Sequence, residues 1–417
     1  MKKVNILHLS DLHFGIEVSD SCPINRKKDH ERALEKLIAT LRTIPIQHPD
    51  WKPDVVAISG DIGWSASETD YQAATEFLLK LLDSFGLSST DLLCCPGNHD
   101  LIKDRNRSLF NIATREHAME SLAIDNLQYR CSPFEPFANF AQKMNISPLN
   151  NNAPNHEALP YIYGWRDYKG LRFVVFNTAW NCRGKTDKGN LWIGESTVND
   201  VESIFSSSNP LTVTLMHHPF ADLHDNEQRI YENHPVVQEM ILKLSDIILT
   251  GHVHGEIRVS DCLHGKTRVF TSSAAYDRYS FNKGCQIIQL DLDLNCFSTL
   301  VLRFNTIDQE WDIKENFEEK ISLVNTHQCS QIPVPIATPP SLSREEDIFL
   351  AIIDYIHNYA TCHFVRVIDS MTLSKKIRDL GGKPNKIIDR LIELGELSLR
   401  IIGTEEVIRS YNINNCK

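Results

Sequence analysis

Five short polar blocks follow apolar runs along this chain, and their placement constrains the fold more than any other feature. The blocks are Asp11-Leu12-His13, Gly60-Asp61, Gly97-Asn98-His99-Asp100, His217-His218-Pro219 and Gly251-His252-Val253-His254. Each preceding run has the length of a buried strand, and amphipathic segments separate the first three runs. Such a β-α-β-α-β rhythm places loops at the carboxyl ends of the strands. We therefore expect the five blocks to meet in one pocket.

The first half of the chain predicts a strand-helix alternation. Strands are expected at residues 4–9, 54–59 and 91–95, and helices at 30–42 and 71–85, the latter ended by Gly86. Between residues 101 and 160 the pattern loosens, with aromatic residues among Pro and Asn. This part reads as an insertion of loops and short helices, either a lid beside the pocket or a surface excursion without a role.

The second half is richer in strand signals. Strands are expected at residues 171–177, 211–216, 246–249, 257–259, 267–271 and 286–292, with a hairpin over 297–311. Together with the first half, these runs predict an α/β (α+β) fold in which two stacked sheets carry helices on their outer faces.

A change of composition marks the last part of the chain. The segment 325–343 is rich in proline and reads as a linker between a domain at 1–324 and a module at 344–417. Helices at 345–359, 370–380 and 386–394, followed by strands at 397–402 and 407–411, predict a winged-helix-like module. Because its eleven Lys and Arg balance eleven Asp and Glu, contact with a protein partner or a second copy is favoured over DNA binding.

Composition narrows the classes of protein further. The 417-residue chain has a net charge of −11, which disfavours a main role in gripping nucleic acid. Its eleven cysteines are irregularly spaced and contain no CxxC pair, as expected for reduced thiols in a cytoplasmic protein. No stretch of 18 apolar residues and no apolar leader occurs in the sequence, so we expect neither a membrane span nor a membrane partner.

The residue types in the blocks suit divalent metals. Carboxylate and imidazole are ligands of Mn, Fe, Zn and Ni. Asp61 could bridge two ions through its two oxygens, and His252 and His254 could reach neighbouring ions. We expect Gly60, Gly97 and Gly251 to supply tight turns with positive φ. A single Asp-x-His or Gly-Asp is commonplace without a metal, so it is the whole ordered set that predicts a pocket for two ions, an arrangement suited to hydrolysing phosphate esters.

The order Asp-x-His, Gly-Asp, Gly-Asn-His-Asp, His, Gly-His-x-His resembles the calcineurin-like metallophosphoesterase superfamily over about residues 1–324. The resemblance implies a four-layer β-sandwich flanked by helices and a dinuclear metal centre. It implies these ligands: Asp11, His13 and His254 for the first metal, Asp61 as the bridge, and Asn98, His217 and His252 for the second. His217 is chosen over His218 because the family's ligand stands two residues before the proline. His8 is expected in the core.

The same resemblance implies roles for two neighbours of the ligands. His99 would contact the substrate phosphate and protonate the leaving group, and Asp100 would orient His99 through a hydrogen bond. A hydroxide bridging the two metals would attack phosphorus in line.

Residues 59–63, with Glu68-x-x-Tyr71 and the Pro-Gly-Asn-His-Asp run at 96–100, resemble the class III cyclic-nucleotide phosphodiesterase branch. This favours a nucleotide or another small phosphodiester as substrate. A DNA nuclease of the repair type is the alternative, compatible with the C-terminal module. A scaffold with the phosphoesterase fold that acts through protein partners is a further alternative, and a protein phosphatase role is also open.

Overall fold

The computed structural model describes most of the first three quarters of the chain and part of the remainder. The described residues are 2–18, 27–146, 162–184, 186–203, 210–229, 235–254, 257–261, 267–276, 283–294, 296–317, 352, 367–379, 383–393, 397–402 and 408–413. They belong to two compact units, Met1–Gln331 and Ile332–Lys417. The expected linker at 325–343 lies outside the described residues, so the domain bounds stay a prediction.

The first sheet of the larger unit has the strand order β12-β11-β10-β1-β2-β3. Its strands are β1 (Lys3–Leu9), β2 (Val55–Ile58), β3 (Leu92–Cys94), β10 (Lys283–Asp291), β11 (Cys296–Asn305) and β12 (Glu310–Phe317). β1, β2 and β3 are parallel, whereas β10 to β12 form an antiparallel meander joined to β1. The carboxyl ends of β1, β2 and β3 therefore lie at the same end of the first sheet.

The second sheet has the order β4-β5-β6-β7-β9-β8. Its strands are β4 (Tyr163–Tyr168), β5 (Leu171–Phe176), β6 (Leu211–Leu215), β7 (Ile247–Thr250), β8 (Arg258–Asp261) and β9 (Arg268–Thr271). β5, β6, β7 and β9 are parallel, and the antiparallel strands β4 and β8 form the two edges. β4 was not among the expected strands.

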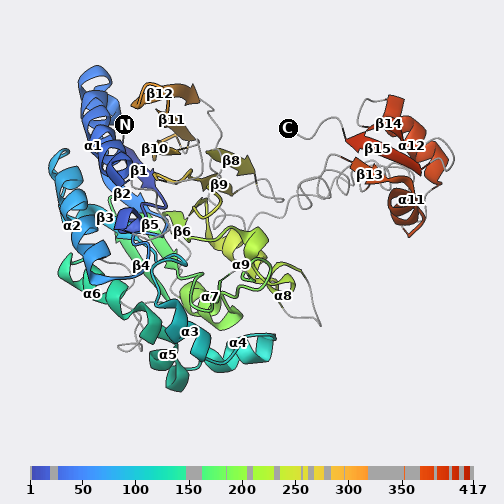
Figure 1. Cartoon of the computed structure of the whole chain (residues 1–417), viewed down its shortest axis with the longest axis horizontal. Helices are drawn as coiled ribbons and strands as arrows, with labels where there is room; N and C mark the ends of the chain where they lie inside the picture. The colour runs from blue at the N-terminus through green and yellow to red at the C-terminus, as the bar shows by residue number, and fades with distance from the viewer. Residues whose placement is uncertain are drawn as a thin grey trace. The chain divides into compact units, whose positions relative to one another are not determined.

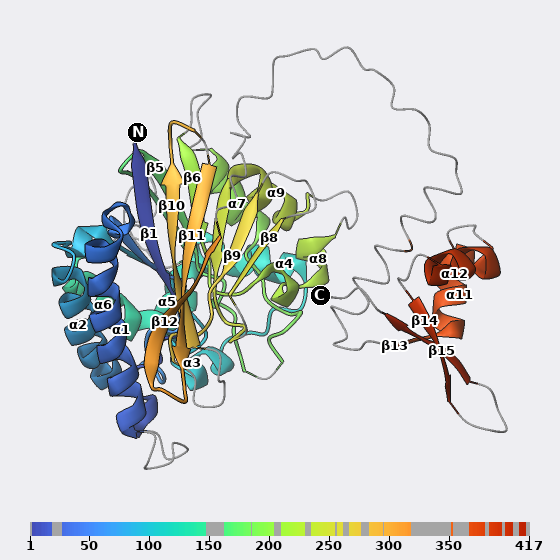
Figure 2. The same cartoon turned by 90° about the horizontal axis from the view of Figure 1, so that it is seen from above.

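The two sheets pack face to face between layers of helices (Figure 2). α1 (Lys27–Gln47) and α2 (Glu68–Asp83) cover the outer face of the first sheet, and their apolar side chains belong to the same buried cluster as those between the sheets. α7 (Glu195–Glu202) and α9 (Val237–Leu244), which were not expected, cover the other face of the second sheet. The expected four-layer α/β sandwich is confirmed.

Strand β5 shows how the sequence builds these layers. Side chains alternate across a sheet. Phe173 and Val175 accordingly lie in the core shared by the two sheets. Val174 and Phe176 pack with α7 and α9 on the opposite face. A continuous apolar run therefore marks a strand that is buried on both faces.

The expected insertion at 101–160 is helical where it is described. Its helices are α3 (Lys103–Ser108), α4 (Arg115–Ser121), α5 (Ile124–Cys131) and α6 (Glu135–Lys143). They extend the larger unit beside α2 and α7 (Figure 1). Residues 147–161 lie outside the described part, and a lid role for the insertion stays a prediction.

The smaller unit contains the expected helices and hairpin. Its elements are β13 (Val367–Asp369), α11 (Ser370–Asp379), α12 (Pro384–Glu393), β14 (Leu397–Ile402) and β15 (Ile408–Ile413), with the sheet order β13-β15-β14. Leu373, Ile377, Ile387 and Leu391 are buried on the inner faces of the two helices. This arrangement is winged-helix-like. The helix expected at 345–359 lies outside the described residues except for Ile352, which is helical and buried.

Among the described residues, no helix is both long enough and apolar enough to cross a membrane. The described cysteines are free thiols, and all except Cys296 are buried.

Phe173→Ala should lower the free energy of unfolding of the larger unit by about 3–5 kcal/mol, because it opens a cavity in a close-packed core. Ile307→Ala is the control, since Ile307 is 89% exposed and should change stability by no more than about 0.5 kcal/mol. All six tryptophans precede Ile332, so tryptophan fluorescence during urea unfolding reports on the larger unit. Equal effects of the two substitutions would contradict this account of the core.

Candidate metal centre

The structure brings all seven expected donors together at one end of the sandwich. Their loops follow β1, β2 and β3 in the first sheet and β6 and β7 in the second. Asp11, His13, Asp61 and His217 are at most 1% exposed. The other three donors, Asn98, His252 and His254, are half-buried. The site is therefore a buried floor with a partly open side.

One group of donor atoms gathers around Asp11. The Nε2 of His254 lies 2.9 Å from Asp11 Oδ1 and 3.2 Å from the Nε2 of His13. His13 Nε2 is 3.7 Å from Asp11 Oδ1 and 4.0 Å from Asp61 Oδ2. Three side chains from two sheets thus aim their donor atoms at one point beside Asp61.

A second group lies on the other side of Asp61. His217 Nε2 is 3.4 Å from Asp61 Oδ2, 3.1 Å from Asn98 Oδ1 and 3.2 Å from His252 Nδ1. The Oδ2 atom of Asp61 therefore faces both groups, the position that a bridging ligand needs.

Each carboxylate offers one oxygen to the centre and has the other held by the protein. Asp11 Oδ2 accepts hydrogen bonds from Ser10 Oγ at 2.5 Å and from the backbone N–H of His252 at 3.1 Å. Asp61 Oδ1 accepts from the backbone N–H of His99 at 2.7 Å. These bonds fix the rotation of both carboxylates and turn Asp11 Oδ1 and Asp61 Oδ2 toward the imidazoles.

These distances fit a pair of metal ions. Donor atoms bound at about 2.0–2.2 Å to one ion stand about 3 Å apart. The contacts of His217 and of His254 are close to that spacing, whereas His13 Nε2 lies 3.7 Å and 4.0 Å from the two carboxylates. His217 donates from Nδ1 to the carbonyl of Ser59 at 2.7 Å, so Nε2 is the ring atom that would bind a metal after losing its proton. In two places imidazole nitrogens face each other at 3.2 Å, and a cation bound between them would stabilise this arrangement.

His218 lies close to the site but is turned away from it. Its ring lies within 4.8 Å of ligand atoms of His217 and His252. However, its Nδ1 faces Thr178 Oγ1 at 2.9 Å and its Nε2 faces the Cys182 sulfur at 3.7 Å. Both ring nitrogens are thus engaged elsewhere, which supports His217 as the ligand. His8 is buried between Ser59 and Gln286, as expected for a core residue.

The backbone around the ligands is unusual. Five expected ligands adopt positive φ values between 48° and 69°: Asp11, His13, Asp61, His252 and His254. Gly60 has the expected positive φ of 93°, but the expectation is wrong for Gly97 and Gly251, whose φ angles lie outside that region. A Cβ at Gly97 would collide with the backbone and carboxylate of Asp61, and one at Gly251 with Ser10. These two glycines are needed because no side chain fits beside Asp61 and Ser10. The strained positive-φ conformation is adopted by the ligand residues themselves.

His99 stands beside the two groups. Its Nδ1 donates to the Trp64 carbonyl at 2.7 Å, and its ring stacks on the Trp64 indole with centroids 4.3 Å apart. The expected hydrogen bond from Asp100 is wrong, because the Asp100 carboxylate accepts from the amides of Ile62, Gly63 and Gly97 instead. The carbonyl and the ring of Trp64 therefore hold the imidazole of His99, and Asp100 does not.

The charges of the site are set by burial and by Asp61. Burial lowers the pKa of His13 to about 3 and that of His252 to about 4, so both rings are neutral. Burial also opposes a charge on His217, but the adjacent Asp61 carboxylate raises the His217 pKa to about 9. Burial likewise opposes the charge of Asp61, whose pKa is nevertheless held well below its usual range by His217. A metal would have to displace the proton of His217.

Two neighbours of the centre escaped the sequence analysis. Trp64 stands three residues after the expected ligand Asp61. A large aromatic residue so close to a ligand could have indicated a contact with the site. Asp222 places its Oδ2 3.7 Å from the Nε2 of His252. It lies in the 3-10 helix Phe220–Asp222, three residues after Pro219, where sequence gives no sign of its direction.

Comparison with known proteins agrees with this geometry. The sequence matches the family described as calcineurin-like phosphoesterase over residues 4–256. It is 23% identical over 261 residues to a Bacillus subtilis protein named uncharacterized metallophosphoesterase-like protein YydB, a match that covers 60% of this chain and 49% of that protein. The chain therefore spans about half the length of this curated relative.

Similar solved structures share little sequence with the chain. A dimetal phosphatase from Danio rerio is 12% identical with a TM-score of 0.43, covering 72% of this chain and 96% of the other. Vacuolar protein sorting 29 from Cryptosporidium parvum is 12% identical with a TM-score of 0.32, covering 76% and 100%.

Gly97→Ala should weaken Mn²⁺ binding at least about 10-fold, because the new methyl group displaces Asp61 from its place between the two groups. Gly86→Ala is the matched control. Gly86 has a positive φ of 64° and nothing within 4 Å of an added Cβ, so it should lose about 1–2 kcal/mol of stability and keep its metal affinity. Isothermal titration calorimetry with Mn²⁺ measures both; an unchanged affinity in Gly97→Ala would refute the packing argument.

Proposed function

Because the chain belongs to the calcineurin-like phosphoesterase family, we propose that it is a dinuclear-metal-dependent phosphoesterase that hydrolyses a phosphodiester. The observation that carries this proposal is the position of Asp61 Oδ2 between two sets of donor atoms, 4.0 Å from His13 Nε2 and 3.4 Å from His217 Nε2. A site for one ion has no use for the second set.

The donors divide into two coordination sets that share Asp61. In the proposed assignment the first ion is held by Asp11, His13 and His254, and the second by Asn98, His217 and His252. Manganese, iron, zinc and nickel all accept these ligands. Two bound divalent ions would supply positive charge for the phosphoryl oxygens and would make a water more acidic.

The chain's own contribution to the reaction centres on His99. Trp64 fixes both the tautomer and the plane of its ring. With Nδ1 committed to the Trp64 carbonyl, Nε2 is the atom that would contact the phosphate and pass a proton to the leaving oxygen. Asp100 would act indirectly, through the backbone of the loops that carry Asp61 and Asn98.

A nucleotide or another small phosphodiester is the proposed substrate class. The run at 59–63 with Glu68 and Tyr71 supports it through its resemblance to cyclic-nucleotide phosphodiesterases. The net charge of −11 does not favour a nucleic acid. A metal-dependent DNA nuclease is the alternative, and a non-catalytic scaffold is the next. We also propose a cytoplasmic location and a protein partner or second copy for residues 344–417.

A substrate panel separates these readings. The full chain with Mn²⁺ is assayed against bis-p-nitrophenyl phosphate, cyclic nucleotides, and labelled single- and double-stranded DNA. Cleavage of the small diesters supports the proposal, and cleavage of DNA alone supports the nuclease. Failure on every substrate, with no metal bound, supports the scaffold.

Asp61→Asn should lower turnover of bis-p-nitrophenyl phosphate by more than about 100-fold, because an amide lacks the second charged oxygen with which a carboxylate bridges two ions. Loss of a residue that only supports a metal ligand already lowers activity by about 10–100-fold, so loss of the bridging ligand should have a larger effect. Asp50→Asn makes the same exchange at a side chain that is 79% exposed and should leave turnover unchanged. Near-normal turnover of metal-loaded Asp61→Asn would rule out the bridging role.

His99→Ala should retain both metals, since the proposed assignment does not use this ring as a ligand, but should lose about 10²–10⁴-fold in kcat where the leaving group needs a proton. The loss should be smaller for p-nitrophenyl esters, whose leaving group needs no protonation. Metal content and kcat on an alkyl and a p-nitrophenyl diester test this. Equal losses on both esters would exclude proton donation by His99.

A further inference from the structure

A single carboxylate ties together two of the loops that carry proposed ligands. Asp100 is fully buried. Its Oδ2 accepts from the amides of Ile62 at 3.1 Å and Gly97 at 2.9 Å, and its Oδ1 accepts from the amide of Gly63 at 2.8 Å. Two of these amides directly follow Asp61, and the third directly precedes Asn98. The Asp100 carboxylate therefore joins the backbone segments that carry these two ligands.

The fourth donor to this carboxylate is a side chain from a helix. The hydroxyl of Tyr71 donates to Asp100 Oδ1 at 3.1 Å. Tyr71 lies in the first turn of α2, whose start is fixed by a capping box between Ser67 and Asp70. Its position thus depends on the helix, whose capping residue Asp70 also accepts hydrogen bonds from Ser65 in the segment that follows Asp61.

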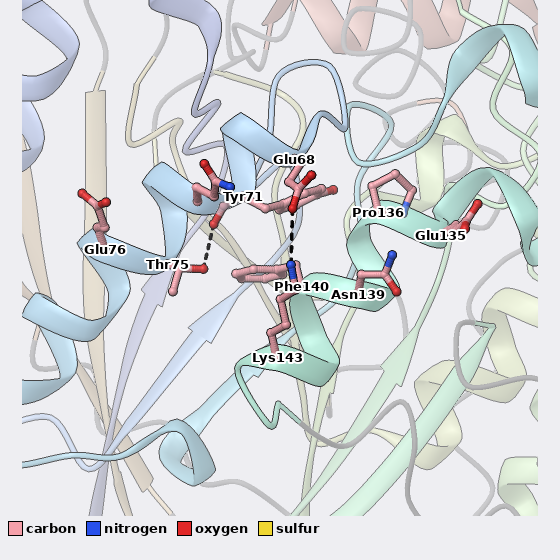
Figure 3. Close-up of a pocket in the computed structure, with 10 residues that line it drawn as sticks. Glu68, Tyr71, Thr75, Glu76, Glu135, Pro136, Asn139, Phe140 and Lys143 are labelled. Carbon is pink, nitrogen blue, oxygen red and sulfur yellow. Dashed lines mark hydrogen bonds and ion pairs between the residues drawn. The ribbon is translucent and has the colours of Figure 1, made fainter.

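The Tyr71 ring is held in place independently of its hydroxyl. It stacks on Phe140 of α6, with centroids 5.0 Å apart and planes 21° apart. Both rings line a cavity of about 580 Å³ between α2 and α6 (Figure 3). Glu68 and Lys143 pair with each other at its rim, 3.5 Å apart. Loss of the hydroxyl alone would therefore leave the ring packed as it is.

We propose that Tyr71 is a positioning residue for the metal centre. Its hydroxyl holds the Asp100 carboxylate in the orientation that keeps Asp61 and Asn98 at the separation needed to bind metal. The inference rests on the proposed function, since it requires these two residues to hold metal.

A physical reason for this fourth hydrogen bond lies in burial. The Asp100 carboxyl group is fully buried, so solvent water cannot satisfy its oxygens. A buried polar group is stable only when donors of the protein fill its hydrogen-bonding capacity. Without the hydroxyl, the amide of Gly63 is the remaining hydrogen-bond donor to Asp100 Oδ1 among the residues that the structure describes. The carboxylate can then turn away from Asp61, and the loops can separate.

The test compares two variants that each remove one hydroxyl from α2. Tyr71→Phe removes the donor to Asp100. Thr75→Val is the matched control, because the Thr75 hydroxyl lines the same cavity and donates to the Tyr71 carbonyl at 2.7 Å without contact to Asp100. Affinity for Mn²⁺ is measured by isothermal titration calorimetry, and stability by thermal unfolding without metal.

We expect Tyr71→Phe to bind Mn²⁺ about 10-fold more weakly, at the low end of what outer partners of metal ligands contribute. Thr75→Val should bind as the wild type does. Phe140→Leu, which disturbs the stacking and keeps the hydroxyl, should lower the melting temperature and preserve the affinity. In a background of Asp100→Ala, which removes the acceptor, Tyr71→Phe should have no further effect, because both changes break the same interaction.

The outcomes are distinguishable. If the wild type binds no Mn²⁺, the proposed function and this inference both fail. If the wild type binds two ions and Tyr71→Phe binds them equally well, only the inference fails. A lower melting temperature of Tyr71→Phe with unchanged metal affinity shows a purely structural tyrosine and also overturns it.

Discussion

The buried carboxylate of Asp61 is the constraint around which the larger unit is arranged. A charge without solvent is costly unless partners surround it. Asp61 receives a backbone N–H from the next loop on one oxygen and faces imidazoles of both sheets on the other. These partners come from both sheets, so the parallel strands of the two sheets must end at the same end of the sandwich. The close approach of Gly97 follows from the same need, since any side chain there would push Asp61 out of place.

The backbone and the charges of the site are both held in states that cost folding stability. Residues other than glycine rarely adopt positive φ, and each such residue stores strain. Here that conformation is concentrated in the ligands themselves, from Asp11 to His254. Burial adds a second tension, because it keeps His13 and His252 neutral while Asp61 favours a proton on His217. A pair of divalent cations would relieve both the charge imbalance and the facing lone pairs.

Local pattern was sufficient to predict which donors lie together at one end of the sandwich. The donors stand directly after apolar strands, so their convergence followed from the geometry of parallel sheets. The partner of Asp100 could not be predicted in this way, because the alternatives differ only by the rotation of one side chain among nearby amides. β4 was missed since Gly164 and polar residues interrupt its apolar pattern, as is common at a sheet edge. α7 and α9 are only eight residues long, too short for a helical period to stand out.

The gradient of burial across the site indicates how a substrate would approach. Asp11, His13, Asp61 and His217 form the closed floor. The side chains of His252 and His254 are 35% and 30% exposed, so the accessible side of the centre is theirs. Val253 between them is 53% exposed, and half-buried Trp64 adjoins His13 and His99 from the first sheet. The accessible side of the centre thus combines imidazole nitrogens with apolar side chains, so any group that reached the donors would contact both kinds of surface.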